Sequence, residues 1–417
     1  MVIADSVLIN GGIPLKGQVS IQGSKNAALP ILAASLLFKE EIYLHNVPDL
    51  LDIRSMLEIM EYLGAQYIFK NSTVYLNCKN ITNKRIPVEF SKKLRASSLV
   101  MGPLLARFGY AEVGMPGGCN IGPRPLNYHF SGFEDLGANV AVEDGLITID
   151  ASENLQGEHS LEFPSVGATE NLITAAVYSK SKVVLKNIAK EPEIIDLINF
   201  LVKGGAKINF TDVTTLEIEG VSYLGNNEHS VCPDRIEAGT FLMAAFATKG
   251  NVRLVGVEPN DLGFVIHKLE EMGASIAVER NTISIAYKGE IKPANIKTTI
   301  FPGFPTDLQS PMTVLMTQAS GESTVVENIF DNRYQHIPEL AKMNAKVELE
   351  DKTAIMHASD LVGAKVDSYD LRGAAAMIIA GLCASGTTRV GGLKHLFRGY
   401  ESFIEKLQYL GADIHYA

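Results

Sequence analysis

The sequence predicts an α/β protein of two domains, each built from three copies of one repeat, with helices inside and strands outside. Three observations support this prediction. A short three-residue phrase, Leu-Gly-Ala or a close variant of it, recurs six times at intervals of about 70 residues. Apolar helical segments alternate with strand-like segments along the chain. The chain has 417 residues, more than one ordinary core accommodates, so the six repeats are expected to divide equally between two domains.

The recurring phrase is expected to mark the end of a helix in each repeat. A helical pattern of polar and apolar residues precedes it, as at residues 262–272 and 401–410. Glycine suits a helix end because it adopts positive φ without the penalty of a Cβ atom. The six copies are Leu63-Gly64-Ala65, Leu136-Gly137-Ala138, Gly204-Gly205-Ala206, Met272-Gly273-Ala274, Met343-Asn344-Ala345 and Leu410-Gly411-Ala412.

Strands with one face in solvent are expected after most copies of the phrase. In residues 275–278 and 282–285, small or polar side chains alternate with branched apolar side chains, which is typical of a half-buried strand. A second helix precedes each phrase, as at residues 238–247 and 373–384, and leads into strands at 252–255 and 387–390. These second helices are apolar on nearly all sides, so they are expected to be buried. Because the sheets have one face in solvent and the helices are buried, the helices are expected to lie inside and the strands outside.

The two ends of the chain are expected to lie in one domain. The last repeat finishes with the strand at residues 413–416 and lacks the strand that should follow it. Residues 7–10 have a strand pattern and can supply the missing strand to the C-terminal half. One domain is therefore expected to be discontinuous in sequence.

Composition indicates a soluble globular protein, with 46% hydrophobic and 20% charged residues. The formal net charge of −10 argues against a nucleic-acid partner. The longest apolar stretches, including 31–38 and 374–384, are too short to cross a membrane, and no signal peptide pattern begins the chain. The four cysteines form no CxxC pair and no cluster with zinc spacing. We therefore expect free thiols, no metal and a reducing, cytoplasmic location.

The loop at residues 114–125 is the segment that least resembles regular structure. Its four glycines and three prolines exclude a regular helix or strand. Cys119 lies in it, and Arg124 follows closely enough to stabilise a thiolate, which would lower the pKa of that thiol toward neutrality. Such a thiol can give and take a proton near pH 7. The alternative is an idle surface thiol, whereas Cys78 and Cys383 are expected to be structural.

Several cationic side chains stand at the expected ends of elements. Lys25 and Asn26 begin an apolar helix, where backbone N–H groups favour anions. The alternative for Lys25 is a solvated surface residue. Arginines that can bind carboxylate or phosphate lie beside small or turn residues. The alternative for them is weak surface ion pairs, and a repeat fold can instead bring several together. These arginines are Arg95, Arg124, Arg333, Arg372 and Arg398.

A carboxylate, Asp307, follows a turn fixed by Pro305. From the residues alone, the preferred interpretation is a cap for a helix near Ser310. His129 and His336 lie near the motifs described here. A lone histidine is more often a hydrogen-bonded structural residue than a catalyst, and no nucleophilic triad is evident.

Taken together, the motifs resemble those of the UDP-N-acetylglucosamine 1-carboxyvinyltransferases, a branch of the enolpyruvyl transferases. The resemblance runs in order over essentially the whole chain. The Cys119 loop is specific to this branch and absent from the related shikimate-pathway branch. The matching segments are residues 24–30, 116–125, 164–171, 233–237, 304–307, 327–333 and 370–372.

The resemblance implies a two-domain inside-out α/β barrel with three βαβαββ units in each domain. It implies that residues 25–232 form one domain and that residues 1–24 and 233–417 form the other, with the active site in the cleft between them. It implies no metal and no organic cofactor.

The resemblance also implies a reaction. The 3-hydroxyl of UDP-N-acetylglucosamine attacks C2 of phosphoenolpyruvate while C3 gains a proton, and the tetrahedral intermediate then loses phosphate. This is the first committed step of peptidoglycan synthesis. Cys119 matches the family's proton donor, which also reacts with the epoxide fosfomycin, and Asp307 matches the proposed base. Cations suit this chemistry because anionic charge must be held and phosphate expelled.

The resemblance assigns further residues to the two substrates. Positions that match phosphoenolpyruvate contacts are Lys25, Asn26, Arg124, Arg333, Arg372 and Arg398, with Lys25, Arg124 and Arg398 on the phosphate side and Arg333 and Arg372 near the carboxylate. Positions that match nucleotide-sugar contacts are Asn26, Arg95, Arg124, Pro125, Leu126, Asn127, Tyr128, Phe163, Pro164, Ser165, Val166, Asp307 and Ile329.

The sequence departs from its relatives at the nucleotide-sugar positions. Asn127 and Tyr128 stand where many relatives carry Asp and Leu, and Phe163 and Pro164 replace the Lys-Val of some relatives. Two other functions compete with the one described. A shikimate 3-phosphate enolpyruvyl transferase is disfavoured by the Cys119 loop. A non-catalytic sugar-nucleotide-binding protein is disfavoured by the complete set of chemical residues.

Overall fold

The computed structural model describes residues 5–117, 122, 125–152 and 155–417. The chain divides into two compact units. The central unit lies within residues 23–117 and 125–232, and the split unit contains residues 5–22 and Pro233–Ala417. Cys119 and Arg124 lie outside the described residues.

Among the described residues, the strands form six four-stranded sheets, three in each unit. Each sheet has one parallel pair followed by two antiparallel pairs. The sheets of the central unit run β14 (Asn227–Ser230), β3 (Glu41–His45), β5 (Thr73–Asn77), β4 (Gln66–Lys70); β6 (Arg85–Ile86), β7 (Tyr110–Gly114), β9 (Leu146–Asp150), β8 (Asn139–Glu143); and β10 (Gly157–Ser160), β11 (Val183–Lys186), β13 (Thr215–Glu219), β12 (Lys207–Asp212).

The split unit repeats this arrangement. Its sheets run β2 (Lys16–Ser20), β15 (Asn251–Val255), β17 (Thr282–Ala286), β16 (Ser275–Glu279); β18 (Asn295–Lys297), β19 (Ser323–Val326), β21 (Thr353–His357), β20 (Lys346–Glu350); and β22 (Lys365–Asp367), β23 (Thr387–Gly391), β1 (Ser6–Asn10), β24 (Asp413–Tyr416).

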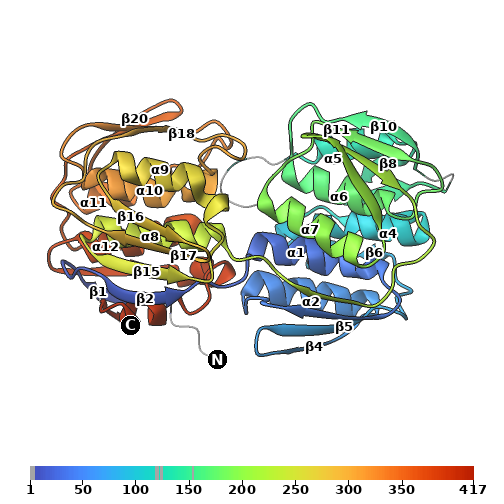
Figure 1. Cartoon of the computed structure of the whole chain (residues 1–417), viewed down its shortest axis with the longest axis horizontal. Helices are drawn as coiled ribbons and strands as arrows, with labels where there is room; N and C mark the ends of the chain where they lie inside the picture. The colour runs from blue at the N-terminus through green and yellow to red at the C-terminus, as the bar shows by residue number, and fades with distance from the viewer. Residues whose placement is uncertain (1–4, 118–121, 123–124, 153–154) are drawn as a thin grey trace. The chain divides into compact units, whose positions relative to one another are not determined.

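Three apolar helices form the interior of each unit, and the sheets surround them (Figure 1). The interior helices contact one another and have few exposed residues. They are α1 (Lys25–Ala34), α4 (Met101–Phe108) and α6 (Val166–Ala176) in the central unit, and α8 (Arg235–Ala247), α10 (Gln309–Thr317) and α12 (Leu371–Cys383) in the split unit. The prediction of helices inside and strands outside is therefore confirmed.

The six amphipathic helices, which include those that end at the recurring phrase, are half-buried, as expected of amphipathic helices at a surface. These helices are α2 (Leu51–Leu63), α5 (Asn127–Asp135) and α7 (Pro192–Lys203) in the central unit, and α9 (Gly263–Glu271), α11 (Ile337–Lys342) and α13 (Phe403–Tyr409) in the split unit. The short helices are α3 (Val88–Ser91), η1 (Ser35–Leu37), η2 (Arg95–Val100), η3 (Pro259–Leu262), η4 (Thr306–Leu308) and η5 (Leu393–Arg398).

The recurring phrase ends a helix in every repeat, as predicted. Its turning residue has positive φ in all six copies. In the fifth copy this residue is an asparagine, which tolerates the left-handed region better than most side chains. The values are 111° at Gly64, 99° at Gly137, 108° at Gly205, 99° at Gly273, 66° at Asn344 and 91° at Gly411.

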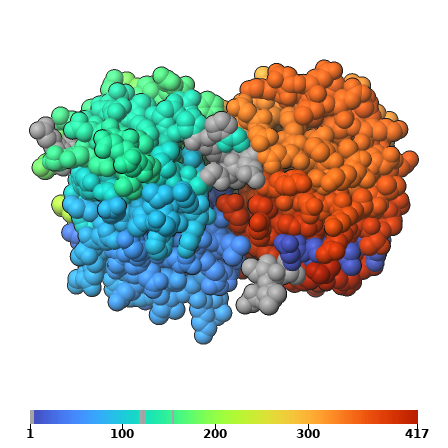
Figure 2. All heavy atoms as spheres, turned by 180° about the vertical axis from the view of Figure 1, so that it is seen from behind, coloured from blue at the N-terminus to red at the C-terminus, as the bar shows by residue number. Residues whose placement is uncertain are grey.

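The N-terminal strand completes the last sheet, as predicted. β1 pairs antiparallel with both β23 and β24 and takes the place that β21 holds in the neighbouring sheet. Figure 2 shows dark blue N-terminal residues among the red residues of the C-terminal segment on the surface of this unit. The split unit is therefore discontinuous in sequence.

Each unit has its own hydrophobic core. In the central unit the core includes Phe38 and Phe200, whose ring centroids are 5.0 Å apart. In the split unit it includes Phe241 and Phe403, at 5.1 Å. Each repeat thus presents its side chains to the core of one unit.

Candidate active site

The split unit holds a carboxylate between two arginines. Arg333 donates from Nη2 to Asp307 Oδ1, and Arg372 donates from Nη2 to Asp307 Oδ2 at 2.8 Å. Both arginine side chains are almost wholly buried, whereas the Asp307 side chain is 27% exposed. Asp307 therefore forms the accessible end of the cluster, with the guanidinium groups beneath it.

This geometry corrects the interpretation of Asp307 as a helix cap. Asp307 lies in η4, and Leu308 is the residue that precedes α10. The Asp307 carboxylate accepts hydrogen bonds from two side chains far along the chain. A cap pattern in sequence and an ion-pair partner in space are indistinguishable when only neighbouring residues are considered.

Arg372 has capacity to bind a further anion. Burial opposes its charge, but the Asp307 carboxylate outweighs this effect and the pKa of the guanidinium is raised above its ordinary value. Its Nε and Nη1 find no hydrogen-bond partner among the described residues. The guanidinium carbon lies 5.3 Å from the centroid of the Tyr400 ring. A charged group with unused buried donors favours an anionic ligand.

Asp370 organises the start of α12 beneath this cluster. Its Oδ1 accepts from the backbone N–H of Arg372 at 2.9 Å and of Gly373 at 3.0 Å. The same oxygen lies 4.0 Å from Arg333 Nη1. A capping carboxylate thus fixes the helix turn that carries Arg372.

His336 is a buried neutral histidine beside Asp370 and Arg333. Burial lowers the pKa of its ring to about 4, while Asp370 acts in the opposite direction. Neither ring nitrogen has a hydrogen-bond partner among the described residues.

Arg398 ends η5 and is half-buried. The segment after it is held by Gln22, whose Nε2 donates to Gly399 O at 3.2 Å and whose Oε1 accepts from Glu401 N at 2.7 Å. The backbone N–H of Gln22 donates in turn to the buried Glu237 at 2.7 Å. Gln22, from the N-terminal segment of the split unit, thus holds the C-terminal segment directly after Arg398, a candidate site residue.

In the central unit, Lys25 is buried at the start of α1. Its Nζ lies 3.4 Å from Asp52 Oδ2 on α2, and Ser24 caps the helix by accepting from Ala27 N at 3.3 Å. The alternative of a solvated surface lysine is therefore wrong. Asn26 is the next residue of the helix and is half-buried.

Asp52, the ion-pair partner of Lys25, was not among the residues predicted from the sequence. Its signal was a carboxylate on the apolar face of an amphipathic helix, in line with the buried Met56 and Ile59.

His129 has the structural role expected of it. Burial, together with the charge of Arg95, lowers the pKa of its ring to about 3. Asn171 Nδ2 lies 3.0 Å from His129 Nδ1 and 3.0 Å from Ser98 O, and its Oδ1 accepts from Gly102 N at 2.8 Å. This network joins η2, which begins with Arg95, to α4, α5 and α6.

The nucleotide-sugar positions of the central unit gather at the starts of α5 and α6. Tyr128 and Phe163 stack with ring centroids 6.1 Å apart and an interplanar angle of 28°. Two of the departures from related sequences therefore contact each other. Leu126 precedes α5 and is buried, Asn127 begins that helix, and Pro125 is exposed.

The start of α6 is held by local hydrogen bonds. Ser165 accepts from Ala168 N at 3.4 Å and donates its own backbone N–H to Phe163 O at 2.6 Å. Pro164 and Val166 flank it and are half-buried.

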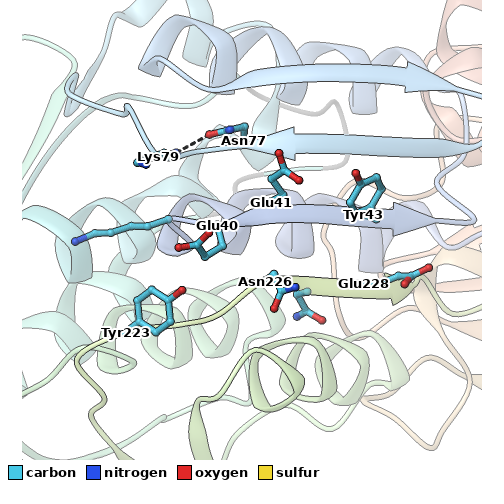
Figure 3. A pocket seen from close by; sticks show the side chains of 10 residues that line it. Glu40, Glu41, Tyr43, Asn77, Lys79, Tyr223, Asn226 and Glu228 are labelled. Atoms are coloured by element: carbon cyan, nitrogen blue, oxygen red, sulfur yellow. Dashed lines mark hydrogen bonds between the residues drawn. The ribbon is translucent and has the colours of Figure 1, made fainter.

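One pocket of the central unit is lined by none of the residues predicted for the site. It has a volume of ≈700 Å³ and is lined by the face of β3, β5 and β14 that is turned away from the helices (Figure 3). Its lining mixes acidic Glu40, Glu41 and Glu228 with basic Lys39 and Lys79. Neighbouring charges of both signs select no single ligand class, so this pocket does not define the function.

The described part of the chain has no group of three His, Cys, Asp or Glu side chains arranged to hold a metal ion. None of the helices described is long and apolar enough to cross a membrane.

Cys78 and Cys383 are the cysteines expected to be structural. Burial raises the pKa of both thiols to about 12, which favours the unreactive protonated form.

Comparisons with known proteins identify relatives over the whole chain. The sequence pattern of the EPSP synthase family (3-phosphoshikimate 1-carboxyvinyltransferase) matches residues 9–407. UDP-N-acetylglucosamine 1-carboxyvinyltransferase 1 of Staphylococcus epidermidis is 45% identical over 415 residues, which cover 98% of this chain and 99% of the relative. UDP-N-acetylglucosamine 1-carboxyvinyltransferase of Halothermothrix orenii is 44% identical over 407 residues, 98% of each chain.

Solved structures share the fold. The enolpyruvyl transferase NikO from Streptomyces tendae superposes with a TM-score of 0.89 at 21% identity over 99% of each chain. EPSP synthase from Acinetobacter baumannii superposes with a TM-score of 0.77 at 17% identity, also over 99% of each chain. These likenesses agree with six sheets in two units.

Proposed function

Because the chain belongs to the EPSP synthase family and, within it, to the UDP-N-acetylglucosamine 1-carboxyvinyltransferases, we propose that it transfers the enolpyruvyl group of phosphoenolpyruvate to the 3-hydroxyl of UDP-N-acetylglucosamine. Phosphate is the second product, and the reaction commits its sugar to peptidoglycan synthesis. The observation that carries this proposal is Asp307 held between two buried arginines, one of which retains two unused donors.

The split unit supplies groups for the reacting centre. Arg333 and Arg372 both donate to the Asp307 carboxylate, and Asp307 is proposed as the base that accepts the proton of the sugar hydroxyl. The unused donors of Arg372 suit the phosphoenolpyruvate carboxylate, with Arg333 beside it. Arg398 is proposed to bind the phosphate, which needs positive charge as it leaves.

The central unit supplies further groups of the proposal. Lys25, at a helix start, is proposed to bind the phosphate with Asn26 beside it, and the dipole of α1 supports this role. Arg95, Ser165 and the Tyr128–Phe163 pair are proposed to bind the nucleotide sugar, since an aromatic face stacks on a base. Ile329 in the split unit is proposed to contact the same substrate.

Cys119 is proposed as the proton donor to C3, and Arg124 as a phosphate contact. Fosfomycin is then an inhibitor, because a nucleophilic thiolate opens an epoxide. A cytoplasmic location, and effects of enzyme loss on cell shape and division, follow from this role in cell-wall synthesis.

Phosphate release tests the proposal directly. The protein is mixed with phosphoenolpyruvate and either UDP-N-acetylglucosamine or shikimate 3-phosphate, with and without fosfomycin. We expect phosphate only with the sugar nucleotide, and its loss after fosfomycin treatment. Release with shikimate 3-phosphate alone would assign the chain to the other branch, and binding without release would make it a non-catalytic protein.

A further inference from the structure

Glu327 is a buried carboxylate that no step of the proposed reaction uses. It follows β19 and is 1% exposed. Its Oε1 accepts from Thr298 Oγ1 at 2.9 Å, Ile329 N at 2.8 Å and Phe330 N at 3.1 Å, and its Oε2 accepts from Thr306 Oγ1 at 3.0 Å. A buried carboxylate is stable only when its oxygens are hydrogen-bonded, and here four donors converge on it.

The Oε2 side leads to the reacting groups. Thr306 immediately precedes Asp307, and its Oγ1 accepts from Arg333 Nε at 3.3 Å. A hydroxyl has one proton, and Thr306 donates it to Glu327, so its lone pairs are turned toward Arg333. This directs the guanidinium so that Nη2 donates to Asp307. Glu327 thus orients Arg333 through one hydroxyl.

The Oε1 side leads to the turn that contains Ile329. Two consecutive backbone N–H groups of that turn point at the same oxygen. Thr298 donates to this oxygen and also accepts from Asn328 N at 2.9 Å. Loss of the Thr298 hydroxyl would loosen this turn without removing the contact between Thr306 and Arg333.

We infer that Glu327 is a positioning residue whose two oxygens serve different parts of the reaction. Through Thr306 it sets the Arg333–Asp307 pair for the chemical step. Through its direct bonds to Ile329 N and Phe330 N, supported by Thr298, it sets the Ile329 turn for binding of the nucleotide sugar. This inference rests on the proposed function for the identity of the two steps. Its geometric content, a carboxylate that orients Arg333 through Thr306, is independent of the substrate.

Two valine substitutions separate the two sides. Thr306→Val keeps the shape of the side chain and removes the hydroxyl between Glu327 and Arg333. We expect kcat to fall by about tenfold to a hundredfold, the range for a hydrogen bond to a charged group, with KM for UDP-N-acetylglucosamine within about twofold of the parent. Thr298→Val is expected to raise that KM by about tenfold and to leave kcat within about threefold.

The matched serine variants identify the hydroxyl as the cause. Thr306→Ser and Thr298→Ser retain the donor and are expected to restore the affected parameter, whereas a purely structural defect would persist or lower both parameters together. If both valine variants changed kcat and KM alike, or if serine restored neither, the division of roles would be wrong.

A crystal structure of Thr306→Val separates this inference from the proposed function. We expect Arg333 to lose its contact with Asp307 in the variant and to keep it in Thr306→Ser. Retention of that contact in Thr306→Val would overturn the positioning role, whatever the activity of the parent. A parent that released no phosphate would instead refute the proposed function, and the two crystal structures would still test how Arg333 is oriented.

Discussion

Each carboxylate oxygen of Asp307 accepts a hydrogen bond from one guanidinium group, so Asp307 is a shared counter-ion of Arg333 and Arg372. Removing the central carboxylate would leave two buried arginines side by side with no common counter-ion. A buried ion pair that loses one partner is destabilised far more than an exposed pair, because the remaining charge stays desolvated. The same change removes the proposed base. Stability and activity should therefore fall together at this residue.

Asp307→Asn is expected to lower kcat by at least about a hundredfold. It is also expected to lower the free energy of unfolding by about 1–3 kcal/mol, less than for a fully buried pair because the carboxylate is partly exposed. Phosphate release and urea denaturation measure the two effects. Asp331→Asn is the matched control, since its ion pair with Lys352 at 3.3 Å is exposed, and it should change neither quantity appreciably.

Glu237 gives the split unit a stability that depends on pH. Burial raises the pKa of this carboxyl to about 7, against the opposing effects of Lys406 at 2.7 Å and of the Gln22 N–H, while Asp234 acts with burial. The folded state therefore holds this proton up to about pH 7, whereas the unfolded state releases it near the ordinary carboxyl pKa of 4.5. Between these values the folded state binds more protons, so the free energy of unfolding falls as the pH rises.

The slope attributable to Glu237 reaches about 1.4 kcal/mol per pH unit. Glu237→Gln cannot titrate and is expected to flatten the curve of unfolding free energy between pH 5 and 7. Urea denaturation at half-unit intervals measures this curve. Glu405→Gln, at an exposed position of α13, should leave the slope unchanged. An unaltered slope in Glu237→Gln would show that another group is responsible.

The Tyr128–Phe163 pair should act on substrate affinity. Stacking of a base on an aromatic ring contributes about 1–3 kcal/mol. Phe163→Ala is therefore expected to raise KM for UDP-N-acetylglucosamine by about tenfold, with KM for phosphoenolpyruvate unchanged. Steady-state kinetics with each substrate varied in turn measures this. Phe210→Ala, another exposed aromatic in the same unit, is the control and should change neither KM.

At the scale of the element, regular patterns predicted most of the fold. The recurring phrase located six helix ends because a residue at positive φ is restricted to glycine and a few others. The expected strand at 275–278 is observed as Ser275–Glu279, and the helix expected over 373–384 is observed as Leu371–Cys383. Periodicity is a property of the local chain, so it can be read without knowing the fold.

The site was less accessible to sequence reasoning, because its residues act through distant partners. Asp307 resembles a helix cap until Arg372 is found beside it in space. Lys25 resembles a solvated residue until Asp52 is found on the next helix. Glu327 carries no local signal of its four hydrogen bonds. Family resemblance supplied the candidate residues, and only the fold shows which described ones meet.

Close packing of the interior helices predicts a contrast between two glycines. A Cβ at Gly102 in α4 would lie 2.3 Å from Asn171 O and 2.3 Å from Thr174 Oγ1, whereas a Cβ at Gly263 in α9 meets nothing within 4 Å. Gly102→Ala should lower the free energy of unfolding by about 1–3 kcal/mol through overpacking. Gly263→Ala should be neutral or stabilising by up to about 1 kcal/mol. Urea denaturation of both variants tests this, and equal effects would contradict it.

At the scale of the whole molecule, the chain has two cores and one unit that begins and ends the sequence. The N-terminal strand β1 lies between β23 and β24, so the split unit is completed only by residues from opposite ends of the chain. The central unit contains its own three sheets and its own core. Damage to β1 should therefore spread through the split unit, including helices far away in sequence, and stop at the central unit.

Two isoleucines in equivalent strands test this independence. Ile9 in β1 and Ile149 in β9 are both fully buried and occupy the same place in their sheets. Truncation of a buried isoleucine to alanine costs about 2–5 kcal/mol. In hydrogen exchange at moderate urea, Ile9→Ala should deprotect residues 371–383 and leave residues 166–176 protected, whereas Ile149→Ala should do the reverse. Equal loss of protection in both helices for either variant would mean that the two units unfold as one.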